Sequence, residues 1–285
     1  MIEVINPTNK KIKETYAYQS DEVILNKIET AHKCFEEWKF TSIADRLELL
    51  GNLSNLLEQK KQKYAKLMTL EMGKPISQSL AEIEKCVWAC QFYEANAEQF
   101  LADELIETDA NESFVSYDPM GSLLAIMPWN YPCWQVIRFV VPNLTAGNTV
   151  ILKHAKNVTG CSDALVELFK DAGYPLGCLQ NVKIEHDQVE LIISDSRIQG
   201  VTLTGSEEAG RTIAALAGKY LKKCVLELGG NNACIVWEDA DLKKYIKTMV
   251  NARMQNAGQS CIAAKRFIVL DSIYEDFKKA FQIEL

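Results

Sequence analysis

Residues 122–152 read SLLAIMPWNYPCWQVIRFVVPNLTAGNTVIL, and this stretch decides the class of fold. Two short apolar runs, Ser122–Met127 and Thr149–Leu152, lie on either side of a helical stretch near 133–146. Short apolar runs separated by a helix are typical of a βαβ unit, in which the two strands pair in parallel. The segment therefore predicts the centre of a parallel sheet.

The same alternation continues toward the C-terminus. Further strands are predicted at Val182–Ile184, Gly200–Leu203 and Cys224–Glu227, and further helices near 158–172, 186–195 and 207–220. We therefore predict an α/β fold with a parallel, Rossmann-like sheet that carries helices on both faces. Sheets of this kind bind ligands at the carboxyl ends of their strands.

The first third of the chain is predicted to be helical. Ser20 is a typical N-cap residue for a first helix. Residues 42–72 carry a helical pattern that Gly73 ends, because glycine suits the position after a helix. Residues 76–101 are predicted to form another helix.

Composition excludes several classes of protein. The chain has 285 residues and a formal net charge of −7 without a basic cluster, which argues against nucleic acid and anionic membranes as partners. No apolar stretch is long enough to span a bilayer, and the N-terminus lacks the apolar segment of a signal peptide. The nine cysteines are an odd number without paired spacing, and the three histidines show no metal-binding spacing. We expect a cytoplasmic protein with free thiols and no bound metal.

Polar residues follow four of the predicted strands. They are the turn Pro128–Pro132, Lys153, the turn Thr204–Ser206, and Glu227. Because carboxyl ends of parallel strands share one edge of a sheet, we expect these residues to lie along the same edge.

Two of these positions have both a functional and a structural interpretation. The turn Thr204–Ser206, followed by Gly210, could offer backbone N–H groups to a phosphate, or could simply cap a helix. Lys153 could reach a phosphate or ribose, or could be a solvated surface charge.

The same ambiguity holds for the candidate catalytic residues. Glu227 could be a general base or part of a structural ion pair, since a glutamate that ends an apolar strand is costly to bury alone. Asn130 could donate to an oxyanion or form an ordinary Asx turn. Cys261 could be a nucleophile, although most buried cysteines are inert.

Taken together, the motifs are more specific than any one of them. Pro-Trp-Asn-Tyr-Pro at 128–132, Lys-His-Ala at 153–155, Thr-Gly-Ser at 204–206, Glu-Leu-Gly-Gly at 227–230 and Gly-Gln-Ser-Cys at 258–261 resemble, in this order, the aldehyde dehydrogenase superfamily. The resemblance runs over nearly the whole chain and is strongest to the succinate-semialdehyde dehydrogenase branch. It implies the NAD(P)-dependent oxidation of a small aldehyde, succinate semialdehyde, to succinate.

The resemblance also implies a role for individual residues. Cys261 would be the nucleophile that forms a thiohemiacetal and then a thioester, Glu227 the base for deacylation, and Asn130 an oxyanion donor. The residues implied to contact the dinucleotide are Met127, Pro128, Trp129, Lys153, Ala155, Lys156, Thr204, Gly205, Ser206, Gly210 and Leu228.

Substrate and cofactor preference rest on two further positions. Arg138 stands at the position of an arginine that resembles a substrate clamp in the succinate-semialdehyde dehydrogenase branch. Such an arginine can hold the distal carboxylate of the substrate bidentately. A second arginine of that branch is not matched, because Gln255 stands at its place and Arg253 lies two residues earlier. Lys156 replaces a glutamate that is frequent in NAD-preferring relatives, so we expect NADP to be accepted at least as well as NAD.

The resemblance predicts the domain organisation as well. Residues 1–110 and 123–226 would form the NAD(P)-binding domain, 111–122 a strand segment for oligomerisation, and 227–285 the beginning of an α/β catalytic domain. Members of the family are longer, so we expect a chain truncated at its C-terminal end. It is then either an aldehyde dehydrogenase or a non-catalytic fragment that at most binds dinucleotide. For full-length relatives the resemblance implies a homodimer or homotetramer.

Overall fold

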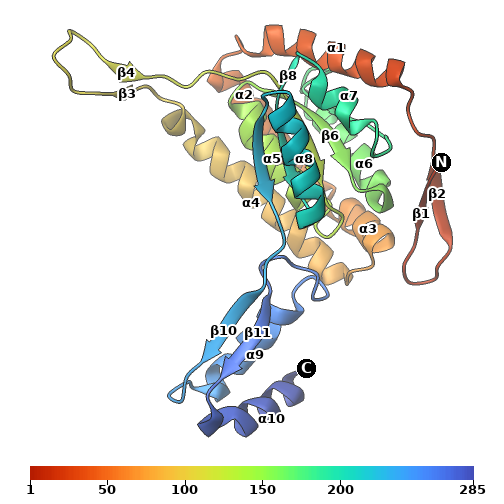
Figure 1. Cartoon of the computed structure of the whole chain (residues 1–285), viewed down its shortest axis with the longest axis vertical. Coiled ribbons are helices and arrows are strands. Elements are labelled where there is room, and N and C mark those ends of the chain that lie inside the picture. The colour runs from red at the N-terminus through yellow and green to blue at the C-terminus, as the bar shows by residue number, and fades with distance from the viewer. The chain divides into compact units, whose positions relative to one another are not determined.

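The computed structural model describes residues 1–285, which divide into two compact units, Met1–Glu227 and Leu228–Leu285. The first unit, drawn in Figure 1, is built around a five-stranded sheet. The strand order of this sheet is β7-β6-β5-β8-β9. Its strands are β5 (Ser122–Met127), β6 (Thr149–His154), β7 (Leu179–Asn181), β8 (Ile198–Thr204) and β9 (Lys223–Glu227). All neighbouring strands pair in parallel, which confirms the predicted sheet.

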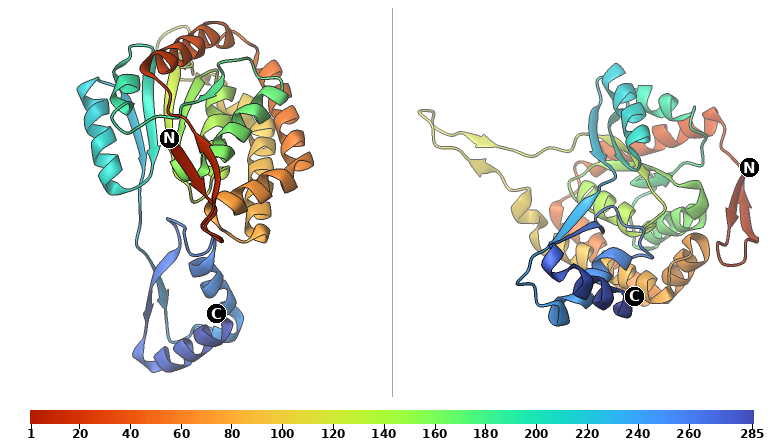
Figure 2. Two further views of the ribbon diagram at one scale, coloured as in Figure 1. Left: turned by 90° about the vertical axis from the view of Figure 1, so that its right-hand side faces the viewer. Right: turned by 60° about the horizontal axis from the view of Figure 1, so that its bottom comes forward.

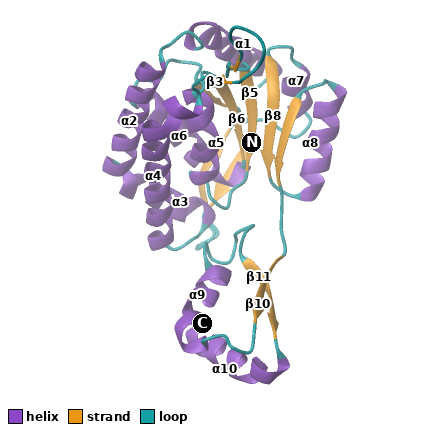
Figure 3. Ribbon diagram, turned by 90° about the vertical axis from the view of Figure 1, so that its left-hand side faces the viewer, coloured by secondary structure: helices purple, strands orange, loops and turns teal.

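Helices cover both faces of this sheet, also as predicted (Figure 3). The helices of the first unit are α1 (Asp21–Trp38), α2 (Ile43–Gln59), α3 (Lys61–Met72), α4 (Ile76–Phe100), α5 (Trp134–Thr145), α6 (Thr159–Asp171), α7 (Val189–Ser194) and α8 (Glu207–Lys219). Ala125 and Leu152 face the core shared with α2 to α6, whereas Ile126 and Lys153 face α7 and α8. Every residue of β6 is buried, because a central parallel strand is covered on both sides.

The N-terminal third contains four helices and a β-hairpin. Ser20 caps α1, since its hydroxyl accepts from the Val23 N–H, and Gly73 ends α3 with a left-handed φ of 84°. The single helix predicted over 42–72 is wrong, because the backbone leaves helical geometry at Lys60 and separates α2 from α3. Helices alone do not account for this part of the chain either, since β1 (Ile2–Ile5) and β2 (Ile12–Tyr16) form an antiparallel hairpin.

The third predicted strand is misplaced. The strand is β7 at Leu179–Asn181, three residues before the predicted Val182–Ile184. It contains two polar residues that are buried and hydrogen-bonded: Gln180 Nε2 donates to the Lys27 carbonyl, and Asn181 Nδ2 donates to Ser162 Oγ. Because these side chains find partners inside the protein, hydrophobicity alone could not locate the strand.

A second hairpin, β3 (Glu104–Leu105) with β4 (Phe114–Val115), extends away from the helices of the first unit (Figure 2). β4 lies within the segment 111–122 that was predicted to contain a strand, whereas β3 was not predicted. Leu105 is 77% exposed and Phe114 is 51% exposed.

The second unit contains β10 (Asn232–Val236), α9 (Leu242–Met254), β11 (Ala264–Val269) and α10 (Tyr274–Glu284). β10 and β11 pair in parallel, and α9 connects them. Their small core holds Val236, Ile246 and Phe277. No helix of either unit is both long and apolar enough to cross a lipid bilayer.

Candidate active site

The carboxyl ends of four strands meet at one edge of the large sheet, as the sequence predicted. Met127 at the end of β5 pairs with His154 at the end of β6, and Thr204 at the end of β8 pairs with Glu227 at the end of β9. Because β5 and β8 are neighbours, the polar residues that follow these strands lie along a common edge.

His154 organises the turn that carries Asn130. The Ala155 N–H donates to its Nδ1 at 2.9 Å, and its Nε2 lies 2.8 Å from the Pro132 carbonyl oxygen. Burial lowers the pKa of His154 to about 4, so its ring is neutral near pH 7. The neutral ring has one N–H group, and its two nitrogens face the carbonyl oxygens of Pro132 and, at 3.2 Å, Met127, so the ring joins the end of β5 to the turn. The sequence pointed to no such role for His154.

The buried carboxylate of Glu82 also supports this turn. Glu82 Oε1, on α4, accepts from the N–H groups of Cys133 and Trp134, each at 2.8 Å, and so caps the start of α5. The other carboxylate oxygen forms an ion pair with Lys74. Lys74 also lies over the ring of Tyr131, 4.9 Å from its centroid. The sequence contains no signal for this support, because the partners lie about fifty residues apart.

Lys153 borders a cavity of about 440 Å³ at the strand ends of β5, β6 and β8. Lys153 is only 7% exposed, and its ammonium group forms no hydrogen bond or ion pair within the chain. Burial lowers the pKa of Lys153, and the nearby charge of Lys156 adds to this effect. His186 shares the cavity, and the charge of Lys153 lowers the pKa of His186. A buried cation without a partner fits an anionic ligand.

The turn after β8 opens α8 onto the same cavity, which Ser206 also lines. Ser206 caps α8 by accepting from the Ala209 N–H at 3.2 Å, so the structural interpretation of this turn is met. A side chain on Gly205 would contact only Leu203, at an ordinary 3.5 Å. The chain itself therefore does not require glycine at position 205. Gly210 is buried in the first turns of the helix.

Lys156 is held by an aromatic partner from the N-terminal segment. Its Nζ donates to the Tyr18 hydroxyl at 2.8 Å and lies 4.9 Å from the centroid of the Tyr18 ring. The ammonium group is therefore fixed near Lys153 instead of moving freely in solvent. With the cavity, the unpartnered Lys153 and the helix start, this cluster fits a phosphate-bearing dinucleotide.

Glu227 and Arg138 come together, but Glu227 is not buried. Its side chain is 56% exposed, because β9 is the edge strand of the sheet and four of its five residues are exposed. Arg138 Nη2 lies 3.7 Å from Glu227 Oε2 and 3.4 Å from Thr204 Oγ1. Trp129 is 39% exposed, whereas Met127 is buried.

Cys261 and Leu228 belong to the second unit. Cys261 is partly exposed and follows three consecutive left-handed residues, Asn256, Ala257 and Gly258. Left-handed geometry is costly for residues other than glycine, so this turn stores strain. Arg253 stabilises it, because its Nη1 donates to the Gly258 carbonyl at 3.0 Å. Arg253 thus has a structural partner within the chain.

Comparisons with known proteins show the family of this chain. The model of the aldehyde dehydrogenase family matches residues 1–285, so the chain belongs to the aldehyde dehydrogenase family. It is 47% identical over 285 residues to a Synechocystis protein described as "Probable succinate-semialdehyde dehydrogenase [NADP(+)]", covering 99% of this chain and 63% of that protein. It is 42% identical over 283 residues to the Mycobacterium tuberculosis "Succinate-semialdehyde dehydrogenase [NADP(+)] 1", covering 98% of this chain and 62% of that protein.

A solved structure is similarly close. The succinic semialdehyde dehydrogenase of Streptococcus pyogenes, in complex with NADP+, superposes with a TM-score of 0.97 at 36% identity, covering 100% of this chain and 63% of that one. The chain thus spans a little under two thirds of the length of these relatives.

Proposed function

We propose that this protein oxidises succinate semialdehyde to succinate with NADP. The observation that carries the proposal is the 47% identity, over 99% of the chain, to a relative described as a probable NADP-dependent succinate-semialdehyde dehydrogenase. The cavity lined by Lys153 and the start of α8, together with Lys156 held by Tyr18, supports it independently.

The chain supplies the groups that such a reaction needs. The Cys261 thiolate attacks the aldehyde carbon to form a thiohemiacetal, and the Asn130 side-chain amide donates to the developing oxyanion. Bound NADP supplies the hydride acceptor that oxidises the substrate. Glu227 then takes a proton from the water that hydrolyses the Cys261 thioester. Its half-exposed carboxylate supports this role, because an exposed group can meet water.

We assign the dinucleotide and substrate contacts to residues on both units. Those proposed to hold NADP are Met127, Pro128, Trp129, Lys153, Ala155, Lys156, Thr204, Gly205, Ser206, Gly210 and Leu228. Lys156 would meet the 2′-phosphate, since Tyr18 already holds its ammonium group in place. Arg138 would bind the distal carboxylate of the substrate, exchanging its long 3.7 Å contact with Glu227 for a charge-assisted pair.

The proposal extends to domains, partners and compartment. Residues 1–110 and 123–226 would bind the dinucleotide, 227–285 would carry the nucleophile, and the exposed apolar residues around β4 support oligomerisation through 111–122. All nine cysteines are free thiols, which supports the cytoplasm as the compartment.

The test measures succinate formation and dinucleotide reduction by the purified protein, with NADP and with NAD. We expect Cys261→Ser to abolish turnover. Lys156→Glu should weaken NADP binding by about tenfold and leave NAD binding equal or tighter, because a glutamate repels a 2′-phosphate. Lys170→Glu, at an exposed lysine of α6, is the matched control. Turnover that survives Cys261→Ser would refute the nucleophile, and an unchanged NADP-to-NAD preference would refute the role of Lys156.

A further inference from the structure

Two cysteines outside the candidate active site lie in direct contact. Cys34 on α1 and Cys178, just before β7, have their sulfur atoms 3.5 Å apart, although 144 positions separate them in the chain. Cys34 is 8% exposed and Cys178 is fully buried. No other two cysteine sulfurs in the structure lie within hydrogen-bond distance of each other, so this dithiol is distinct among the nine cysteines.

A glycine makes the contact possible. Gly177 has a φ of +109°, and a Cβ added to it would lie 2.6 Å from Cys34 Cβ and 2.7 Å from the Thr30 carbonyl oxygen. The backbone at 177–178 therefore packs directly on α1, and no larger residue fits between them. This close approach brings the Cys178 side chain against Cys34.

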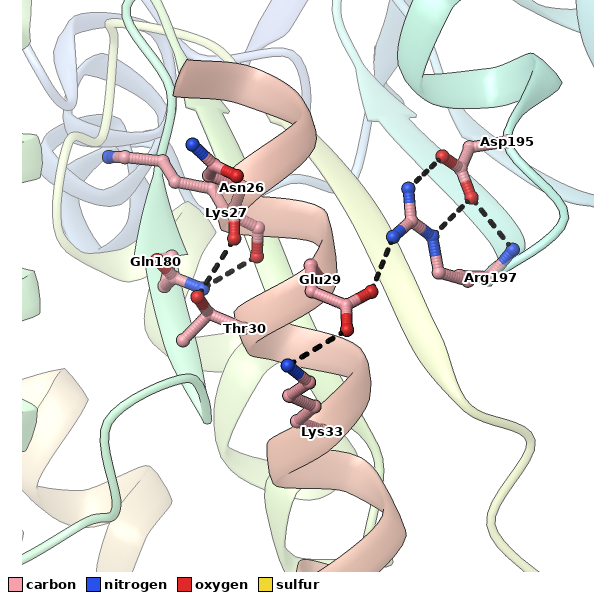
Figure 4. A network of polar contacts seen from close by, with 8 residues as sticks. All are labelled: Asn26, Lys27, Glu29, Thr30, Lys33, Gln180, Asp195 and Arg197. Atoms are coloured by element: carbon pink, nitrogen blue, oxygen red, sulfur yellow. Dashed lines mark hydrogen bonds and ion pairs between the residues drawn. The ribbon is translucent and has the colours of Figure 1, made fainter. Parts of the chain in front are cut away.

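α1 is anchored to two other segments through residues that precede Cys34, as Figure 4 shows. Gln180 Nε2 donates to the Lys27 carbonyl at 2.8 Å, which ties the helix to β7. Arg197 Nη1 donates to Glu29 Oε2 at 2.7 Å, which ties the helix to the segment before β8. The two sulfurs are thus held together by an ordered contact between secondary-structure elements.

A buried cation interacts with Cys178, and the contact between the two sulfurs favours a thiolate at Cys34. Arg46 is 7% exposed, and its terminal nitrogens donate to three carbonyl oxygens, those of Trp38, Lys39 and Thr145. No carboxylate lies within ion-pair distance of its guanidinium group, and its charge interacts with Cys178. The hydrogen bond between the two sulfurs lowers the pKa of Cys34 and raises that of Cys178. The thiolate is the reactive form of cysteine.

We propose that Cys34 and Cys178 form a reversible oxidation site, which hydrogen peroxide closes to a disulfide. The Cys34 thiolate attacks one peroxide oxygen, the O–O bond breaks, and the departing hydroxide takes up a proton to leave as water. This step converts Cys34 to a sulfenic acid. The Cys178 sulfur then attacks the Cys34 sulfur, the S–O bond breaks, and the proton of the Cys178 thiol leaves with the hydroxyl group as a second water. The two sulfurs lose two electrons, and the peroxide is reduced to two waters.

The geometry needs little change for this bond. A disulfide has an S–S distance of about 2.05 Å, so the sulfurs must approach by about 1.5 Å, which small side-chain rotations can supply. The bond would tie α1 to the start of β7 across 144 positions. Closing so long a loop restricts the unfolded chain and stabilises the folded one. The site is independent of the proposed dehydrogenase activity.

The experiment uses the full chain with Cys261→Ser, which removes the candidate nucleophile as a competing target and leaves eight thiols. After treatment with a small excess of hydrogen peroxide and alkylation of the denatured chain, we expect six alkylated cysteines. Trypsin should release residues 34–39 linked to residues 171–183, and dithiothreitol should separate them. The midpoint of thermal unfolding should rise by about 5–10 °C on oxidation and fall back on reduction.

Two variants in the same background sharpen the result. Cys34→Ser should abolish both the linked peptides and the rise in the thermal midpoint. Cys86→Ser, which removes another buried cysteine of the core, should preserve both. The proposal is overturned if peroxide leaves Cys34 and Cys178 as free thiols, if it oxidises Cys34 without linking it to Cys178, or if the link forms only in urea. The peptide map of the Cys261→Ser chain decides these outcomes even where Cys34→Ser folds poorly.

Discussion

The two units of the chain are stabilised very differently. In Met1–Glu227, the central strands β5 and β6 are almost wholly buried between two layers of helices. In Leu228–Leu285, two parallel strands share a core of three buried apolar residues, and Ile235 and Ile268 remain 67% and 49% exposed. Parallel sheets depend on cover over both faces. We therefore expect the second unit to open at a lower free energy than the first.

The candidate site residues are divided between the two units. The cavity, Lys153 and Lys156, and the turn that carries Asn130 lie on the first unit, where buried polar partners such as Glu82 and His154 hold the backbone in place. The candidate nucleophile Cys261 lies on the second unit, next to a strained turn that the side chains of Arg253 and Asn256 stabilise.

The largest expected effect is on the first unit, through Glu82→Ala. The change leaves the Lys74 ammonium buried without its carboxylate and removes the acceptor of two backbone N–H groups. We expect the loss of this buried pair to lower the free energy of unfolding by about 4 kcal/mol. Urea unfolding measures this loss. Glu84→Ala, at an exposed position two residues along the same helix, should cost about 0–1 kcal/mol. Equal losses for the two variants would show that the pair does not support the first unit.

A somewhat smaller effect is expected on the second unit, through Phe277→Ala. Phe277 packs against Phe267 and Phe281, with ring centroids 5.7 Å and 5.5 Å away, so its loss should cost about 3 kcal/mol. Amide hydrogen exchange should accelerate in α9, α10, β10 and β11 while β5 and β6 stay protected. Ile283→Ala, at a 77% exposed position of α10, should change neither. Loss of protection in β5 and β6 would mean that the units unfold together.

The smallest expected effect is a pH dependence confined to the first unit, which contains all three histidines. The pKa of His154 is about 4 when folded and about 6.5 when unfolded, so below pH 6.5 the unfolded chain binds a proton that the folded chain does not. This histidine should therefore destabilise the fold by about 2 kcal/mol between pH 7 and pH 5.

The check is urea unfolding of His154→Gln across this pH range. The variant should lose less stability on acidification than the wild type, whatever its stability at pH 7. His32→Gln on α1 is the control for the loss of a histidine. A wild-type slope in His154→Gln would contradict the assignment of a buried neutral ring.

Strands β5, β6, β8 and β9 were predictable because each is an apolar run bounded by polar residues or turns. β7 was not, since Gln180 and Asn181 look like loop residues until their buried partners are known. Family resemblance brought Asn130, Glu227 and Cys261 into one hypothesis. The exposure of Glu227 could not be predicted, because local sequence does not reveal that β9 is an edge strand.

Periodicity and strand-end positions were thus enough to infer a parallel α/β sheet and the edge at which its polar residues gather, because both follow from local spacing. The support of that edge could not be inferred in the same way. Glu82 beneath the Asn130 turn, Tyr18 against Lys156, and Cys34 against Cys178 join segments 51 to 144 positions apart. Such contacts exist only once the helices have packed on the sheet, since packing alone brings these side chains together and removes them from water.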